Sequence, residues 1–241
     1  MDDAAGRFAA ALTALELGSP DPALLPERLA RACAAALPVD GAGLTCTFSA
    51  DRRLPIGSSD AEAAAAERLQ FTVGEGPCLT AHVEQRTVAT AGDEMAARWP
   101  VYAAELALRT RYRGVVSAPV PGALSRTAAV NVFLRRAEDV AAVDEADLLA
   151  VAAAMGAALG DDLAGSAGRP LGMPAWLDGE PVADRQQVWR AVGFLVGRDG
   201  GSAGAAIARL RARAFTLGRD LESVAAAVLA GEEPSAPSSG R

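Results

Sequence analysis

The sequence contains no lysine: all 23 basic residues are arginine, set against 30 aspartates and glutamates, for a formal net charge of −7. Histidine occurs once, at His82, and cysteine three times, at Cys33, Cys46 and Cys78. Three scattered cysteines exclude a disulfide framework and a tetrahedral cysteine metal site. A single histidine excludes histidine-pair metal centres and disfavours a catalytic triad. The acidic total argues against nucleic-acid binding by the chain as a whole.

Long apolar runs and a basic leader are also lacking. No run of about 18 or more uncharged apolar residues occurs, so the sequence predicts no membrane-spanning helix. The N-terminal residues Met1, Asp2 and Asp3 are acidic where a secretory signal would be basic, and we therefore expect a cytoplasmic protein. With 51% hydrophobic and 22% charged residues the chain can form cores. Its 241 residues suffice for two domains of roughly 100–200 residues each.

What is present divides the chain into two units of opposite charge. Glycines and prolines interrupt every periodicity between residues 160 and 181, which predicts a linker. Residues 1–162 hold 14 arginines and 22 acidic residues, a net of −8, whereas residues 183–231 hold 7 arginines and 4 acidic residues, a net of +3. The predicted organisation is a first domain at 1–160, a linker at 161–182, a second domain at 183–231 and a disordered tail at 232–241. The basic second domain indicates an anionic partner.

The first domain alternates helical and strand patterns, which predicts an α+β fold. Helices are expected at 2–17, 24–37, 60–69 (capped by Asp60), 77–84, 99–109 and 143–159. Strands are expected at 43–49, 54–58, 87–90, 113–119 and 127–135. The second domain is helical throughout, at 184–196, 203–215 (capped by Ser202 and stopped by Gly218) and 221–229 (capped by Asp220). Three short helices with tight turns predict a small bundle.

One pair of residues in the first domain is a candidate for catalysis. Cys78 and His82 stand four residues apart, so one helical face could pair a thiolate with its base. A buried thiol beside a polar surface residue is the preferred interpretation, because no third residue orients the pair. Acidic residues such as Asp144 and Asp147 are better explained as first-turn helix charges than as metal ligands. We expect no enzyme activity and no metal site.

The glycine-rich segment before that helix admits two interpretations. Gly74, Glu75 and Gly76 precede Pro77 and Cys78, but the segment lacks the Gly-Lys-Ser/Thr ending of a phosphate loop. The first interpretation is a tight loop leading into the helix, with Pro77 in its first turn. The second is a small-ligand or sensory loop. With few aromatic residues and no clear charged cage, we expect the domain's pocket to bind a small apolar ligand or to be a packed dimer scaffold.

The arginines of the second domain are candidates for phosphate binding, because a planar guanidinium gives bidentate hydrogen bonds. At ~100° per residue, Arg209 and Arg213 fall opposite the apolar stripe of the middle helix, and Arg211 lies near the stripe's edge. Arg190 is the sole charge between Val188 and Val196, on a helix that we expect to pack on two sides. A merely solvated face is the alternative for these arginines. Trp189 and Phe215 could stack on bases, although core packing is preferred for both.

The second domain resembles an ANTAR domain, the three-helix RNA-binding output module of bacterial transcription antitermination regulators. The shared positions are Ala191-x-Gly193, Ser202, Leu210-Arg211-x-x-Ala214-Phe215 and Gly218-Arg219-x-Leu221-x-x-Val224-Ala225. The segment 71–79, with its Gly-Glu-Gly-Pro-Cys core, is similar to the GAF domains that precede ANTAR in actinobacterial proteins, and the missing lysine agrees with such a source. Two features depart from many relatives: Gly204 stands where an acidic residue is common, and a Gly/Pro linker replaces a continuous coiled coil.

The resemblance implies a GAF-like antiparallel sheet flanked by helices, followed by an ANTAR bundle. It implies a homodimer that binds RNA carrying tandem stem-loops, so that the bound RNA cannot complete a terminator hairpin. The residues expected to contact RNA are Arg190, Arg209, Arg211, Arg213 and Arg219. The residues expected in the sensor loop are Gly74, Glu75, Gly76 and Cys78, with an unidentified small ligand and no cofactor.

Three alternatives stay open at this point. The first is a small-molecule or protein-interaction sensor whose bundle only mediates dimerisation. The second is a helix-turn-helix DNA binder, for which the third helix offers only Glu222 and Ser223 as base-reading residues. The third is a redox centre at Cys78.

Overall fold

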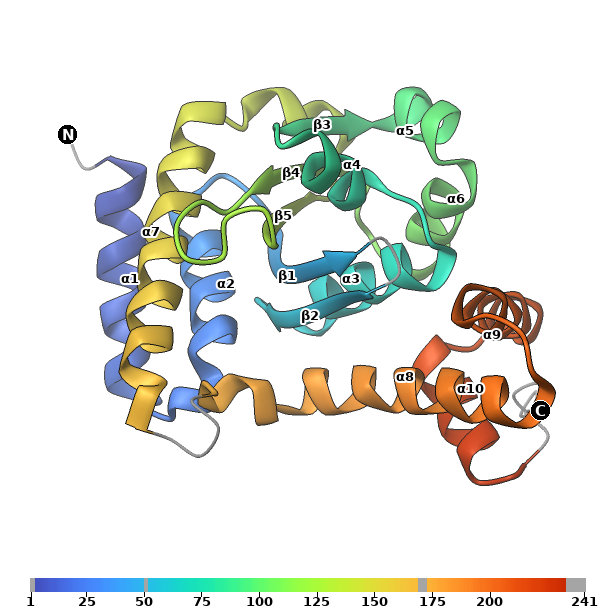
Figure 1. The fold of residues 1–241 in the computed structure, drawn as a ribbon. Helices are drawn as coiled ribbons and strands as arrows, with labels where there is room; N and C mark the ends of the chain where they lie inside the picture. The colour runs from blue at the N-terminus through green and yellow to red at the C-terminus, as the bar shows by residue number, and fades with distance from the viewer. Residues whose placement is uncertain (1–2, 50–51, 169–172, 233–241) are drawn as a thin grey trace, which may run out of the picture.

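The computed structural model describes residues 3–49, 52–168 and 173–232. It confirms the α+β class: a five-stranded sheet in the order β2-β1-β5-β4-β3 has helices on both faces (Figure 1). The strands are β1 (Gly41–Ser49), β2 (Arg52–Ser58), β3 (Val88–Ala91), β4 (Gly114–Pro119) and β5 (Ala128–Leu134). Each neighbouring pair is antiparallel, as expected.

Two groups of helices cover the two faces of the sheet (Figure 1). On one face stand α1 (Ala4–Gly18), α2 (Leu25–Ala36) and α7 (Glu145–Gly165). On the other lie α3 (Ala61–Val73), α4 (Pro77–Glu84), α5 (Gly92–Arg98) and α6 (Pro100–Arg109). Because side chains alternate along a strand, Val130 and Val132 of β5 join the core under the first group, whereas Phe133 joins the core under the second.

The capping residues predicted from the sequence form their hydrogen bonds. The Asp60 carboxylate accepts from the backbone N–H groups of Glu62 and Ala63, at 2.8 and 2.9 Å, and so begins α3. Ser202 and Asp220 cap the two later helices in the same way. These side chains satisfy backbone donors that have no partner inside the helix. The short helix α5 was not predicted.

The connection between the two domains differs from the predicted linker. Helix α7 continues to Gly165 and α8 (Glu180–Asp199) begins inside the predicted 161–182 segment, since a proline is tolerated in a first helical turn. Trp176 is buried, and its indole N–H donates to Asp162 at 3.1 Å, which ties the connection to α7. Residues 169–172 and the tail from 233 onwards, where disorder was predicted, lie outside the described residues.

Helix α7 bears on the expectation that no helix spans a membrane. The segment Glu145–Gly168 is long and apolar enough, by length and composition, to cross a membrane. The segment contains no uncharged run of about 18 residues, because aspartates interrupt it at both ends. In this structure Leu148, Met155 and Leu159 of α7 are buried in the core of the first domain.

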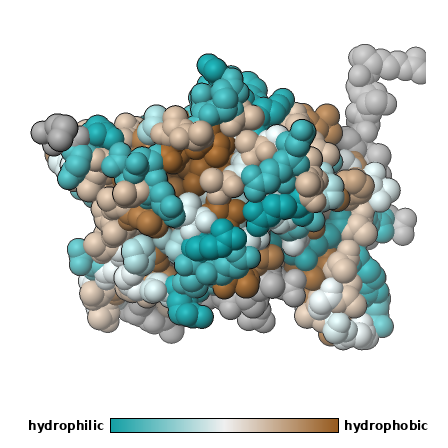
Figure 2. Space-filling view, turned by 90° about the horizontal axis from the view of Figure 1, so that it is seen from above, coloured by the Kyte–Doolittle hydropathy of each residue, from teal (hydrophilic) through white to brown (hydrophobic). Residues whose placement is uncertain are grey.

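The second domain is the predicted three-helix bundle, formed by α8, α9 (Ala203–Leu217) and α10 (Leu221–Leu229). Helix α8 packs against α9 and α10 and also against β2, which confirms its two-sided packing (Figure 1). Phe71, at the end of α3 in the first domain, belongs to the same apolar cluster as Leu210 and Val224 of the bundle. The two domains are therefore docked. Seen from above, hydrophobic residues of the molecule gather in separate patches between hydrophilic ones (Figure 2).

Candidate nucleic-acid interface and sensor interior

Three arginines surround a hollow of about 680 Å³ on the outer side of the bundle. Arg209 and Arg213 lie one turn apart on α9, and Arg198 comes from the last turn of α8. Phe194 lines the same hollow and is 44% exposed, an unusual position for a large aromatic ring. Its ring centroid lies 5.6 Å from the Arg198 guanidinium. We call this hollow the arginine groove.

Asp199 partly neutralises the arginine groove. Its carboxylate accepts hydrogen bonds from Nε and Nη2 of Arg198, at 2.6 and 2.9 Å, and from Nη1 of Arg209, at 3.5 Å. The Arg198 hydrogen bonds hold the pKa of Asp199 below its usual range. Glu232 also lines the hollow. Two carboxylates among three guanidinium groups leave a small excess of positive charge, which suits an anionic ligand such as phosphate.

The structure brings together only some of the predicted RNA-binding arginines. Arg209 and Arg213 line the groove, whereas Arg190 is exposed elsewhere on α8 and Arg219 is half-buried at the turn after α9. Arg211 points the other way, toward the first domain. This agrees with the helical wheel, since two residues along α9 mean a rotation of about 200°.

Sequence reasoning missed Phe194, Arg198 and Asp199. Phe194 and Arg198 stand four residues apart on one face of α8, and this spacing was the available signal. The expected core packing of Phe215 is wrong: its side chain is 57% exposed, because Leu210 and Ala214 occupy the inward stripe of α9. Trp189 is half-buried, with its ring edge-on to Phe71 at a centroid distance of 5.8 Å.

The predicted sensor loop is a tight connection between α3 and α4 that is hydrogen-bonded to the start of α6. Gly74 and Gly76 have φ values of +82° and +139°, a conformation that favours glycine. Glu75 accepts hydrogen bonds from the backbone N–H groups of Val101 and Tyr102, both at 3.1 Å, at the start of α6. The backbone N–H of Cys78 donates to the side-chain oxygen of Gln70 at 2.9 Å. These contacts fit the tight-loop interpretation.

A buried polar cluster lies behind this loop, where the sequence suggested no charged group. The Glu67 carboxylate, on α3, accepts hydrogen bonds from Thr45 Oγ1 at 2.5 Å and from Asn131 Nδ2 at 2.6 Å. Ser117 Oγ donates to the carbonyl oxygen of the Asn131 side chain at 2.6 Å. Burial raises the pKa of Glu67, and its hydrogen bonds and the nearby Arg53 oppose that rise. The pocket region therefore contains charged groups, which are unfavourable surroundings for the small apolar ligand that was one of the two expectations.

The space beside this polar cluster is small. A cavity of about 10 Å³ is lined by Arg53, Glu67, Gln70, Phe71 and Cys78, among others. That volume holds at most about one water molecule. In this conformation the first domain is thus packed around its buried charges, and a larger ligand requires movement of the lining residues.

The environment of Cys78 opposes a nucleophilic role. Burial raises the pKa of its thiol to about 12, and the neighbouring Glu67 carboxylate acts in the same direction. A reactive thiolate needs the opposite shift. Burial likewise lowers the pKa of His82. Within the described residues, no three histidine, cysteine, aspartate or glutamate side chains are grouped so as to hold a metal ion.

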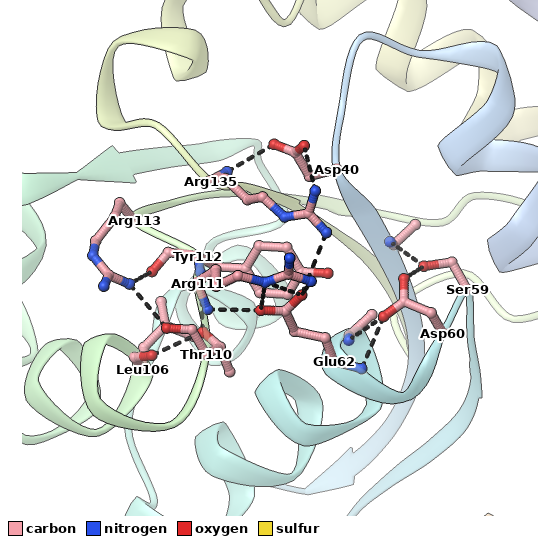
Figure 3. Close-up of polar contacts among 12 residues, drawn as sticks. Asp40, Ser59, Asp60, Glu62, Leu106, Thr110, Arg111, Tyr112, Arg113 and Arg135 are labelled. Atoms are coloured by element: carbon pink, nitrogen blue, oxygen red, sulfur yellow. Dashed lines mark hydrogen bonds and ion pairs between the residues drawn. The ribbon is translucent and has the colours of Figure 1, made fainter.

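An ionic network fixes the beginning of α3 (Figure 3). Glu62 accepts hydrogen bonds from the backbone N–H of Arg111 at 2.7 Å and from its Nη2 at 2.6 Å. Arg135 bridges Glu62 and Asp40, at 3.5 and 3.6 Å. The hydrogen bonds from Arg111 lower the pKa of Glu62 to about 2. Helix α3, which carries Glu67 and Phe71, is thus anchored at its N-terminal end.

Fold and site together define a two-part protein, in which an α+β domain with a polar interior is docked on a helical bundle with an arginine-lined groove. No protein-family model, curated protein or solved structure matches this chain. The resemblance to GAF and ANTAR domains therefore rests on the sequence positions named above.

Proposed function

We propose that this chain is an RNA-binding transcription antitermination regulator, in which a GAF-like sensor domain controls an ANTAR-type bundle that binds structured, stem-loop RNA. The observation that carries this proposal is the arginine groove, where Arg198, Arg209 and Arg213 surround the exposed ring of Phe194. The groove keeps a small excess of positive charge on a protein whose net charge is −7.

The chemistry of the groove suits RNA in two ways. Guanidinium groups bind phosphate oxygens, and this sequence-independent contact supplies much of the affinity for nucleic acid. An exposed aromatic ring can stack on an unpaired base. In the proposed mechanism a cytoplasmic homodimer binds two tandem stem-loops, and the bound RNA cannot complete a terminator hairpin.

The test is a double charge reversal, Arg209→Glu with Arg213→Glu, in the full-length chain. Binding to a fluorescently labelled RNA with two tandem stem-loops is measured over a range of salt concentrations. We expect affinity to be lost, while circular dichroism shows unchanged helix content. Each phosphate contact contributes roughly 0.7–0.9 to the slope of log affinity against log salt, so the slope of residual binding should also fall.

The matched control reverses two exposed arginines of the first domain, Arg31→Glu with Arg86→Glu, which changes the net charge equally. This control should keep both the affinity and the salt slope. If the groove variant binds RNA as well as the control does, the proposal is wrong. Dimerisation that persists in sedimentation, together with only weak polyanion binding in every variant, would favour a bundle that serves dimerisation alone.

A further inference from the structure

A second aromatic site lies on the inner side of the bundle, and a residue of the first domain fills it. The Phe71 side chain, in the last turn of α3, is 2% exposed. Its ring centroid lies 3.5 Å from the Arg185 guanidinium carbon and 5.1 Å from that of Arg211. The ring of Trp189 meets it edge-on at an interplanar angle of 74°. We call the site formed by Arg185, Trp189 and Arg211 the socket.

The socket contacts the backbone of Phe71 in addition to its ring. Arg211 Nε donates a hydrogen bond to the Phe71 carbonyl oxygen at 3.1 Å. The socket therefore binds a flat aromatic ring and a neighbouring oxygen acceptor at the same time. These are also the two features that a nucleotide offers, since a base has a flat π face and the base edges and phosphate carry acceptor oxygens.

Arg185 has hydrogen-bonding capacity that Phe71 does not use. Its side chain is completely buried, and its Nη2 forms an ion pair with Glu222 at 2.9 Å. Within the described part of the chain, its Nε and Nη1 have no hydrogen-bond partner. A buried donor without a partner is destabilising, because it has lost its hydrogen bonds to water. A phenyl ring stacks on this guanidinium but offers no acceptor to its N–H groups, whereas the edge of a nucleobase does.

Arg185 also keeps its positive charge in this position. Burial lowers its pKa to about 10, while the Glu222 carboxylate opposes the shift, so the guanidinium is protonated at neutral pH. Arginine guanidinium planes stack on bases in the recognition of unpaired nucleotides. The socket thus combines a charged stacking plane, an aromatic edge and unused donors.

We propose that the socket is a binding site for an unpaired nucleobase of RNA, and that Phe71 occupies it in place of the base when the two domains are docked. This inference rests on the proposed function and deepens it. RNA and the first domain then compete for one site: the base enters only after the bundle leaves α3. The arginine groove, on the other side of α9, stays accessible in both arrangements.

The experiment compares the wild-type full-length chain with Phe71→Ala, using two labelled RNAs. One is a hairpin with an unpaired loop, and the other is a fully paired duplex with the same number of phosphates. Removing the competing ring should raise the hairpin affinity by about tenfold or more, because the binding-competent fraction increases. The duplex affinity should stay unchanged, since it depends on the groove. Adenosine monophosphate at a concentration equal to that of the hairpin should not displace it.

Hydrogen exchange followed by mass spectrometry reports undocking independently of RNA. Phe71→Ala should increase exchange in peptides covering 66–76 and 184–196, with no change in α1. The matched control is Phe8→Ala, which truncates another buried phenylalanine in the core of the first domain, away from the socket. It should lower stability without raising the hairpin affinity. Phe71→Leu keeps apolar volume and loses the flat face, so it should act in the same direction if the alanine variant does not fold.

The double variant Phe71→Ala with Arg185→Lys separates stacking from charge. Lysine keeps the positive charge but offers no planar group, so the gain in hairpin affinity should disappear while duplex binding persists. An undocked Phe71→Ala variant with unchanged hairpin affinity and retained duplex binding would overturn the socket alone. Failure of every variant to bind either RNA would overturn the proposed function together with the socket.

Discussion

Replacing Glu67 by glutamine tests whether the buried negative charge in the first domain lowers the free energy of unfolding. Glu67 is 4% exposed, and both of its oxygens accept hydrogen bonds. Its pKa is nevertheless raised, which means that desolvation outweighs the hydrogen bonds and nearby cations. Glutamine has nearly the same shape, accepts from Asn131 and donates to the Thr45 hydroxyl, which can rotate. We expect Glu67→Gln to be at least as stable as the wild type at neutral pH.

The pH dependence gives the sign of this effect. The pKa is raised above its ordinary value of 4.5, so between these two pKa values the folded chain holds a proton that the unfolded chain has released. The free energy of unfolding of the wild type therefore falls as pH rises through that window, by about 1.4 kcal/mol for each unit of the shift. Glu67→Gln lacks this decrease, so the two curves should converge below about pH 4.5.

The assay is urea unfolding followed by circular dichroism across the pH range. Glu67→Ala serves as the contrasting variant, because it leaves a cavity and removes the acceptor of Thr45 and Asn131; it should lose about 2–5 kcal/mol. In a chain of this size each kcal/mol corresponds to about 2–4 °C in melting temperature. A glutamine variant that is less stable than the wild type at neutral pH, with the difference vanishing in acid, would refute the reasoning.

Three further predictions concern other parts of the chain. Glu62→Gln should lower the free energy of unfolding by about 1 kcal/mol at neutral pH. Because Arg111 lowers the pKa of Glu62 to about 2, this difference from the wild type should shrink as pH falls from about 4.5 toward 2, as urea titrations would show. Gly156→Ala should lower the melting temperature by at least about 2–4 °C, since a Cβ there would lie 1.9 Å from a backbone oxygen. The control is Gly197→Ala, which has open space around it and should be neutral or stabilising. Cys78, buried with a pKa of about 12, should resist iodoacetamide in the native state and react fully in urea, as mass spectrometry would show.

The secondary structure was largely predictable because it depends on local patterns. The alternating apolar residues of 127–135 identified the central strand β5, and Asp60 marked the start of α3. The end of α7 at Gly165 was missed because glycines at 160 and 165 were read as breaks, although glycine is tolerated inside a helix at a cost of about 1 kcal/mol. The local sequence pattern determines whether a helix or strand forms, whereas packing against the rest of the fold determines the residues at which it ends.

The polar interior and the socket could not be predicted, because their parts are distant in sequence. Glu67 lies in an alanine-rich helix that suits an exposed face equally well, and its partners Thr45 and Asn131 come from two separate strands. Arg185 counted toward the net charge of +3 of the second domain, yet it is completely buried against Phe71. Which arginines are exposed depends on packing between the two domains, and net charge carries no information on that packing.

The last turn of α3 connects the two features that the sequence did not reveal. Glu67, Gln70 and Phe71 stand three and four residues apart, so they share one side of the helix. Arg53 of the first domain donates to the Gln70 carbonyl oxygen at 2.8 Å, and Arg211 of the bundle donates to the next carbonyl, that of Phe71, at 3.1 Å. Because α3 is anchored at its start by Glu62, a change at the polar cluster that shifts its final turn must act on both hydrogen bonds. The proposed competition between Phe71 and RNA would therefore depend on a single helical turn whose position is set by the interior of the first domain.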